Sequence, residues 1–231
     1  IDTISGLVFN AWGDRPIEGP YGVWFDGDWN KPRLDDPAIQ KGLSDYAGLM
    51  QAGPSDILSY NWNEAGNAFC NGQAAFFADA SLFGPWLESD DCPISKDNTG
   101  YMALPPQKKG GTSYTANWQW GIGMGANAQE KDAGWYFIQY MTNKSSEPKI
   151  GTYHGGAGRL STWENDEYTS TLNADYVSAT LESMKTVRTS VVPVKDFNKY
   201  ALEVMDVILK IHAGESSESA TAEGNENFKN M

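Results

Sequence analysis

The sequence predicts an α/β fold, and two short apolar segments among amphipathic ones carry this prediction. Residues 74–78 form an uninterrupted apolar run that is too short for a helix. Such a run indicates a strand buried on both faces, as in a parallel sheet. Residues 118–124 alternate large apolar residues with small or polar ones, which is the period of a half-buried strand. Apolar residues at helical spacing elsewhere predict the covering helices.

Composition limits the classes of ligand. The chain has 231 residues, with 17 basic against 30 acidic ones, so its formal net charge is −13. This charge opposes binding to nucleic acid or to an anionic membrane surface, and a neutral ligand suits it better. The 9 Trp and 11 Tyr include flat rings that can stack on the C–H faces of sugars, although most aromatic residues belong to the core. No apolar run approaches the roughly 20 residues of a membrane span, and no signal peptide begins at Ile1. We therefore expect a mature chain or a fragment.

The first 16 residues predict a strand and a loop that faces ligand. Residues 4–9 are apolar enough for a strand, and residues 10–16 follow its carboxyl end. Trp12, Asp14 and Arg15 combine a stacking surface with charged groups that clamp hydroxyls. The alternative is a surface ion pair beside a packed indole.

The next segment predicts a hairpin and then a helix. Asp26-Gly27 is typical of a tight turn between aromatic strands over residues 21–29. Asp36 before Pro37 is an N-cap signal for a helix that ends at Gly53-Pro54. Its apolar positions have helical spacing and are expected in the core: Ile39, Leu43, Tyr46 and Met50.

Residues 61–86 are expected to form the functional centre. Asn61 and Glu64 resemble a capping box, and Gly72 is a left-handed stop, so a short helix is predicted between them. The predicted strand 74–78 then ends at Asp79. Ligand crevices in open α/β sheets lie outside the carboxyl ends of strands. We therefore expect Asp79, Ser81 and residues 83–86 to lie at such a crevice.

The second half contains one glycine-dense loop between helices. A strand is predicted over residues 101–104, and it stops at Pro105-Pro106, which is a predicted hinge. Helices are predicted over 128–141, 175–187 and 196–214. The polar tail after them resembles a frayed helix. The helix 128–141 is expected to bury Trp135, Phe137, Ile138 and Met141. The loop 153–161 carries Arg159, whose fork of donors can hold adjacent hydroxyls. The alternative is an ion pair of Arg159 with Glu164 or Glu167.

Metal and nucleotide motifs are incomplete, so no cofactor and no metal are expected. Residues 26–37 begin like a calcium loop, but Lys31 replaces the glycine and Pro37 the final glutamate. A zinc site needs more ligands than the two histidines and two separated cysteines supply. Gly121, Gly123 and Ala126 fit the dinucleotide fingerprint, but the acidic residue at the end of a second strand is missing.

Several motifs together resemble one family, the extracellular solute-binding proteins of ABC sugar importers, and within it the branch that binds polyols such as mannitol and sorbitol. The resemblance covers residues 7 to about 214. Its motifs are Asn63-Glu64, Phe69, residues 72–75, Asp79, Pro85-Trp86, residues 24–29, Tyr101 with Pro105, residues 117–120, Gly158-Arg159 before Ser161, and residues 163–168.

The resemblance implies a class II, periplasmic-binding-protein-like fold of two α/β lobes that close on ligand about a hinge. It assigns residues 1–108 to the C-terminal lobe, 109–162 to the N-terminal lobe, and 163–231 to helices that pack on the C-terminal lobe. The rest of the N-terminal lobe, which precedes Ile1 by this resemblance, is absent. The expected ligand-binding residues are Arg159, Asp79, Trp86, Trp120, Trp118, Trp12, Asp14, Arg15, Asn63 and Glu64.

The family also implies a state for Cys70 and Cys92, which flank the predicted strand 74–78. An exported protein would oxidise the pair to a disulfide, whereas a cytosolic protein would leave two buried thiols. The location implied is periplasmic or extracytoplasmic, with a lipid anchor on the full-length protein as an option.

The function implied is binding of a sugar or sugar alcohol and its delivery to an ABC transporter permease, by a protein that is monomeric when full length and is not an enzyme. The alternative is a glycoside hydrolase that uses a carboxylate pair such as Asp79 and Glu64. If the polypeptide truly begins at Ile1, the aromatic face of residues 118–124 would lie open, and such a protein should bind hydrophobic dyes, self-associate or recruit the absent segment as a second chain.

Overall fold

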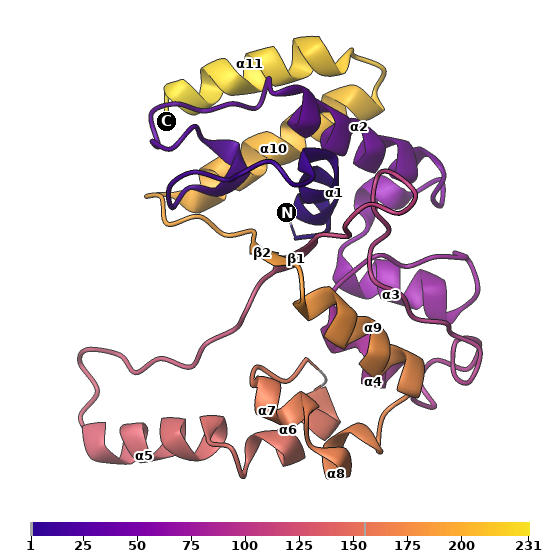
Figure 1. Cartoon of the computed structure of the whole chain (residues 1–231), viewed down its shortest axis with the longest axis vertical. Coiled ribbons are helices and arrows are strands. Elements are labelled where there is room, and N and C mark those ends of the chain that lie inside the picture. The colour runs from indigo at the N-terminus through magenta and orange to yellow at the C-terminus, as the bar shows by residue number, and fades with distance from the viewer. Residues whose placement is uncertain (1, 155) are drawn as a thin grey trace. The chain divides into compact units, whose positions relative to one another are not determined.

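The computed structural model describes residues 2–154 and 156–231 and divides them into two compact units (Figure 1). Unit 1 comprises residues 1–65, 103–118 and 182–231, and unit 2 comprises residues 66–102 and 119–181. These bounds differ from the predicted domain bounds at 108/109 and 162/163. The assignment of the segments to lobes of a larger protein stays a prediction.

Unit 1 is built from four long helices around one apolar core. They are α1 (Asp2–Trp12), α2 (Pro37–Gln51), α10 (Phe197–His212) and α11 (Ser217–Lys229). The side chain of Asp36 caps α2 by accepting from Ala38 N, and Pro37 takes the first turn, as predicted. The α1 and α2 backbones are so close that a Cβ on Gly42 would lie 2.6 Å from Val8 Cα. A glycine is therefore required at position 42.

The prediction of a strand over residues 4–9 is wrong, because these residues lie inside helix α1. Ile4, Val8 and Trp12 are spaced four residues apart and are all buried, which is the pattern of one helix face. A short apolar run does not by itself distinguish a buried strand from a buried helix. The four-residue spacing up to Trp12 was the overlooked signal.

The polar tail is an ordered helix rather than a frayed one. Ser216 caps α11 by accepting from Ser219 N. Ala220 and Phe228 are buried, and the Phe228 ring stacks on Phe25 with centroids 5.6 Å apart. These apolar contacts, together with the hydrogen bond from Leu34 N to Asn225 and the ion pair of Lys210 with Glu223, hold this predominantly polar helix against the core.

The described residues contain one sheet, of two short parallel strands. β1 (Thr115–Asn117) pairs with β2 (Val187–Thr189), with Thr115 opposite Val187 and Asn117 opposite Thr189. Within the described ranges the predicted strands 74–78, 101–104 and 118–124 are not formed, and the predicted hairpin is reduced to a 3₁₀ turn, Gly22–Trp24, and one bridge between Phe25 and Pro32. A strand persists only where a neighbour accepts its backbone hydrogen bonds.

Unit 2 holds helices of 4 to 12 residues joined by loops. Its elements, two of which extend into unit 1, are α3 (Trp62–Cys70), α4 (Gly84–Leu87), α5 (Lys131–Thr142), α6 (Glu147–His154), α7 (Leu160–Trp163), α8 (Asp166–Thr169) and α9 (Ala174–Met184). The predicted helices 61–72, 128–141 and 175–187 are confirmed as α3, α5 and α9. None of the described helices is long and apolar enough to cross a membrane.

The prediction that α5 buries its aromatic residues is wrong. Trp135 and Phe137 are each 55% exposed, and Tyr136 and Tyr140 are exposed as well. The preceding segment is similar, since Trp120 and Ile122 are exposed. Helical periodicity therefore predicted the helix but not the cover for its apolar face.

Candidate functional site

In unit 2, the chain around Asp79 is an extended loop that enters a turn. Asp79 is half-buried, and its Oδ1 accepts from the backbone amide of Ala80 at 2.7 Å. The Phe83 ring packs edge-on against Phe77 at 5.3 Å between centroids, which holds the two ends of the loop together. The loop therefore presents a carboxylate from a fixed backbone, although the predicted strand before it is absent.

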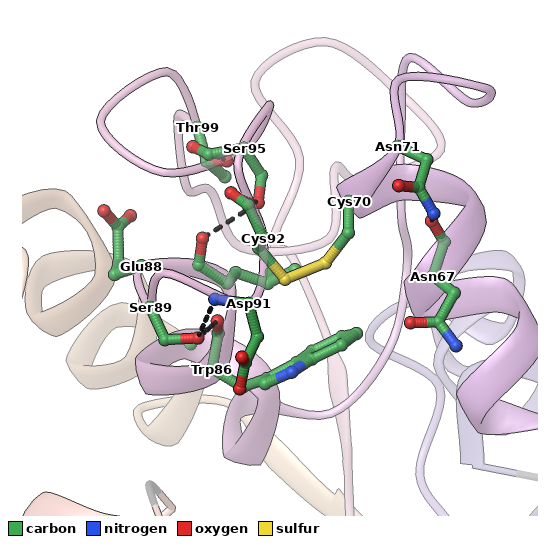
Figure 2. The surroundings of a disulfide bond; sticks show 12 residues. Asn67, Cys70, Asn71, Trp86, Glu88, Ser89, Asp91, Cys92, Ser95 and Thr99 are labelled. Carbon is green, nitrogen blue, oxygen red and sulfur yellow. Dashed lines mark hydrogen bonds between the residues drawn. A yellow bond between two sulfur atoms is a disulfide. The ribbon is translucent and has the colours of Figure 1, made fainter.

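Trp86 lies beside the predicted disulfide, which the structure contains (Figure 2). Cys70, at the end of α3, is joined to Cys92, with the Cα atoms 4.7 Å apart. The half-buried Trp86 ring packs so closely on Gly66 of α3 that a Cβ there would lie 2.7 Å from it. The cross-link thus ties the end of α3 to the loop that follows α4, and the Trp86 ring of α4 packs against α3.

The glycine-dense loop is held by hydrogen bonds to its backbone and neighbours. Glu147 of α6 accepts from the Gly158 amide at 2.8 Å and, through its other oxygen, from the Thr162 hydroxyl. The indole N–H of Trp163 donates to the Ala157 carbonyl at 2.8 Å. Gly155 lies outside the described residues. The loop on either side of it has a defined shape.

Arg159 is exposed and anchored at one nitrogen. Its Nε donates to the carbonyl of Thr142, at the C-terminus of α5, at 2.6 Å, where a cation suits the helix dipole. In the described part of the chain it forms no ion pair with Glu164 or Glu167, the alternative considered from sequence. The terminal nitrogens of the guanidinium make no hydrogen bond there, so they can donate to a ligand.

The two loops of unit 2 touch each other. A Cβ on Gly156 would lie 3.4 Å from Leu82 Cα, so the glycine loop rests on the backbone that follows Asp79. Gly158 in turn lies against the side chain of Gln119, the residue that separates Trp118 from Trp120 in the sequence. The structure therefore brings the loops of Asp79 and Arg159 together, and the Gln119 side chain to the same loop.

A cluster of aromatic rings packs next to these loops. Trp163 contacts Tyr168 and Tyr176 edge-on at 5.6 and 5.8 Å between centroids. Burial raises the pKa of Tyr176 to about 12, and burial and then the bond to Glu88 raise the pKa of Tyr101 far above its ordinary value. Both phenols therefore stay protonated at neutral pH and act as neutral hydrogen-bonding groups.

In unit 1, the predicted group of Trp12, Asp14 and Arg15 makes contacts within the protein. Trp12 is 3% exposed and donates from its indole nitrogen to the Arg15 carbonyl. The Arg15 guanidinium lies 3.7 Å from the Trp12 ring centroid and binds both oxygens of Asp36 at 2.9 and 2.7 Å. These contacts favour the alternative of an ion pair beside a packed indole, and a ligand role for the three residues stays a prediction.

Arg188 was missed by sequence reasoning. Its guanidinium lies 3.6 Å from the Tyr114 ring centroid and donates to the Gly13 carbonyl at 2.8 Å. The Tyr114 hydroxyl donates to the carboxylate of Asp14. Arg188 therefore neutralises the C-terminal end of α1 and holds the tyrosine that orients Asp14. A single arginine in a three-residue strand gave no signal of this role.

The remaining predicted ligand residues are placed separately in the two units. In α3, Oε2 of Glu64 accepts from the Asn61 amide at 2.9 Å, which is the predicted cap, and Asn63 is exposed. Trp118 and Trp120 are 44% and 71% exposed. Unit 1 holds Trp12, Asp14, Arg15, Asn63, Glu64 and Trp118, whereas unit 2 holds Asp79, Trp86, Trp120 and Arg159.

The polar and aromatic groups of the candidate site are of the kinds that bind polyhydroxyl ligands. Over residues 2–154 and 156–231, no group of three His, Cys, Asp or Glu side chains is placed to hold a metal ion. Within unit 2 the candidate groups are one carboxylate, one guanidinium and the face of an indole. Carboxylates and guanidinium groups bind hydroxyls, and ring faces pack on C–H groups.

A guanidinium, a carboxylate and an indole face on neighbouring loops are groups of the kind found in binding sites for small polar molecules. The family profile described as "Bacterial extracellular solute-binding protein" matches residues 4–148. The chain belongs to this family.

Individual relatives agree with this family. The "Mannitol-binding protein" of Pseudomonas aeruginosa is 28% identical over 192 residues, which are 80% of this chain and 41% of that protein. A solute-binding protein of Agrobacterium radiobacter K84, solved with ribitol, superposes with a TM-score of 0.78 at 19% identity, over 99% of this chain and 56% of that chain. Maltose-bound MalE3 of T. maritima gives a TM-score of 0.73 at 18% identity, over 98% and 56% of the two chains.

These similarities confirm the predicted family and fold class, the periplasmic-binding-protein-like α/β fold. The chain spans 41% of the curated relative and 56% of each of the two solved relatives. The matched family consists of binding proteins rather than enzymes.

Proposed function

We propose that this chain is part of the solute receptor of an ABC importer and that the receptor binds a sugar alcohol or a related sugar. One observation carries the proposal. In this chain, which belongs to the family and is similar to a mannitol-binding protein, the Asp79 loop and the Arg159 loop of unit 2 contact each other beside a cluster of aromatic rings. Trp86 and Trp120 are the candidate stacking surfaces. The terminal nitrogens of Arg159 and the carboxylate of Asp79 are the candidate partners of adjacent ligand hydroxyls.

The wider setting follows from the same proposal. The receptor acts in the periplasm or otherwise outside the cytoplasmic membrane, with lipid anchoring as a variant, and delivers its ligand to the membrane permease. The net charge of −13 supports a neutral ligand over nucleic acid. The full-length protein is proposed to be a monomer that releases its ligand chemically unchanged.

Calorimetric titration of the protein, expressed with its full natural chain, tests this function. D-mannitol, D-sorbitol, ribitol and maltose serve as ligands, and we expect saturable binding of at least one polyol. The ligand is then recovered from the complex and analysed by chromatography. Recovery of unchanged polyol supports a receptor, whereas the absence of binding to all four compounds contradicts the proposal. Incubation with aryl glycosides covers the hydrolase alternative, because release of the aryl group would reveal an enzyme.

A further inference from the structure

We propose that Tyr176 is the positioning residue of the candidate site, because its side chain holds the Asp79 loop and the Arg159 loop in their mutual arrangement. The inference rests on the proposed function, since it concerns the same loops. Tyr176 itself belongs to helix α9, outside both loops. In the sequence, Tyr176 is only one residue of the predicted helix 175–187.

The hydroxyl of Tyr176 bridges the two loops directly. It donates to the carbonyl of Ser81, two residues after Asp79, at 2.7 Å. Its oxygen accepts from the amide of Gly156, three residues before Arg159, at 3.4 Å. One phenol oxygen therefore fixes backbone from both loops, and because burial keeps the phenol protonated, both bonds are present at neutral pH.

The ring of Tyr176 fixes a third segment, the turn that carries Trp86. A Cβ on Gly84 would lie only 2.3 Å from the Tyr176 ring, so the ring is in contact with the first residue of α4. The ring is 3% exposed and packs edge-on against Tyr101 at 5.5 Å between centroids. A buried ring with several contacts has one well-defined rotamer, which makes it a rigid support.

The chain offers a matched control in Tyr101. Its hydroxyl lies 2.7 Å from Glu88 Oε1 and 3.5 Å from the Gly84 carbonyl, and it makes no hydrogen bond to Ser81 or Gly156. Glu88 also accepts from Asn173 at 3.2 Å, so it keeps a partner when the Tyr101 hydroxyl is removed. Tyr176→Phe and Tyr101→Phe each keep the ring and remove one buried hydroxyl from the same aromatic cluster. Only Tyr176→Phe removes the hydrogen bonds to Ser81 and Gly156.

The experiment compares the two variants in the full natural chain. Calorimetric titration with D-mannitol and ribitol gives affinity, and hydrogen exchange without ligand gives the protection of the amides in residues 156–159. We expect Tyr176→Phe to weaken polyol binding by roughly three- to tenfold, as for loss of a buried hydrogen bond, and to speed exchange in residues 156–159. Tyr101→Phe should leave exchange in residues 156–159 at the wild-type rate and should weaken polyol binding less than Tyr176→Phe does.

The outcomes separate this inference from the function on which it rests. Equal effects of the two variants, or no effect of Tyr176→Phe, would overturn the positioning role while leaving the receptor function intact. If the wild-type protein binds neither these polyols nor D-sorbitol and maltose, the proposed function is contradicted. Hydrogen exchange, which needs no ligand, still decides whether Tyr176 holds the loops.

Discussion

Units 1 and 2 are stabilised in different ways. Unit 1 encloses a continuous apolar core contributed by its four long helices and their connections, in which Leu34, Ile39, Leu43, Val207 and Ile208 are fully buried. Among the described residues of unit 2, the buried apolar side chains include a small cluster of Cys70, Leu87 and Cys92 and the aromatic rings of Trp163, Tyr168 and Tyr176. A cross-link, aromatic ring contacts and hydrogen bonds to loops supply the remaining order there.

This difference relates stability to function. Close packing of aliphatic side chains leaves little freedom for a loop that has to contact a ligand. Loops held at a few defined points can present polar groups outward and still keep their shape, which is what a binding site needs. Substitutions in unit 1 should therefore act mainly on stability, and those in the loops of unit 2 mainly on affinity.

The largest expected effect is on the core of unit 1. Leu43→Ala removes a side chain that is 0% exposed in α2, and the cavity should lower the free energy of unfolding by about 2–5 kcal/mol. Urea unfolding followed by circular dichroism measures this change. Leu49→Ala, on the same helix but 55% exposed, is the control and should change stability by less than about 0.5 kcal/mol. Equal losses for the two variants would contradict the packing contrast.

The next effect concerns the cross-link of unit 2. The cysteines are 22 residues apart, and replacing both by Ala should lower the free energy of unfolding by roughly 3 kcal/mol in the loop-entropy account. Hydrogen exchange should show lost protection in α3 and α4 and unchanged protection in α10. Wild-type protein denatured without reductant should contain no free thiol. Two free thiols per chain would mean that Cys70 and Cys92 are not cross-linked.

A smaller effect, on affinity, is expected for Arg159→Ala. Loss of a charged hydrogen-bond donor to ligand should weaken polyol binding by roughly 1.5–3 kcal/mol, with little change in melting temperature because the side chain is exposed. The control is Lys149→Ala, which removes one positive charge from the exposed surface of the same unit. If both variants bind like wild type in calorimetric titration, Arg159 does not contact the ligand.

The smallest effect is a pH dependence in unit 1. The hydrogen bond from Arg15 lowers the pKa of Asp36 in the folded protein below its ordinary value. The unfolded state therefore binds the proton more readily, so this contribution to stability is present above the unfolded pKa of about 3.9 and is lost as pH falls through the lower folded pKa. Urea unfolding from pH 5 to pH 3 should show a shallower loss for Asp36→Asn than for wild type. Arg15→Gln should reproduce this shallower slope, and a slope unchanged in both variants would contradict the linkage.

The sequence by itself determined helices α2, α3 and α10 and the family. The caps at Asp36 and Glu64 and the periodic apolar positions of α2 and α10 act within a few residues of chain, so local chemistry suffices to predict them. The pairing of Cys70 with Cys92 was predictable for a related reason, because two cysteines allow one connection and an exported family oxidises them.

Only the tertiary structure decided which apolar segments have partners and which polar residues serve the site. Residues 4–9 and 74–78 both have the composition of a strand, yet the first lies in a helix that packs on α2 and the second pairs with no strand in the described chain. Arg33 covers the ring of Trp12, and Tyr176 is hydrogen-bonded to Ser81 and Gly156. Each of these contacts joins residues at least 20 positions apart in the sequence, which no local pattern relates. Such contacts depend on where other segments place their backbone, and periodicity within one segment carries no information about that.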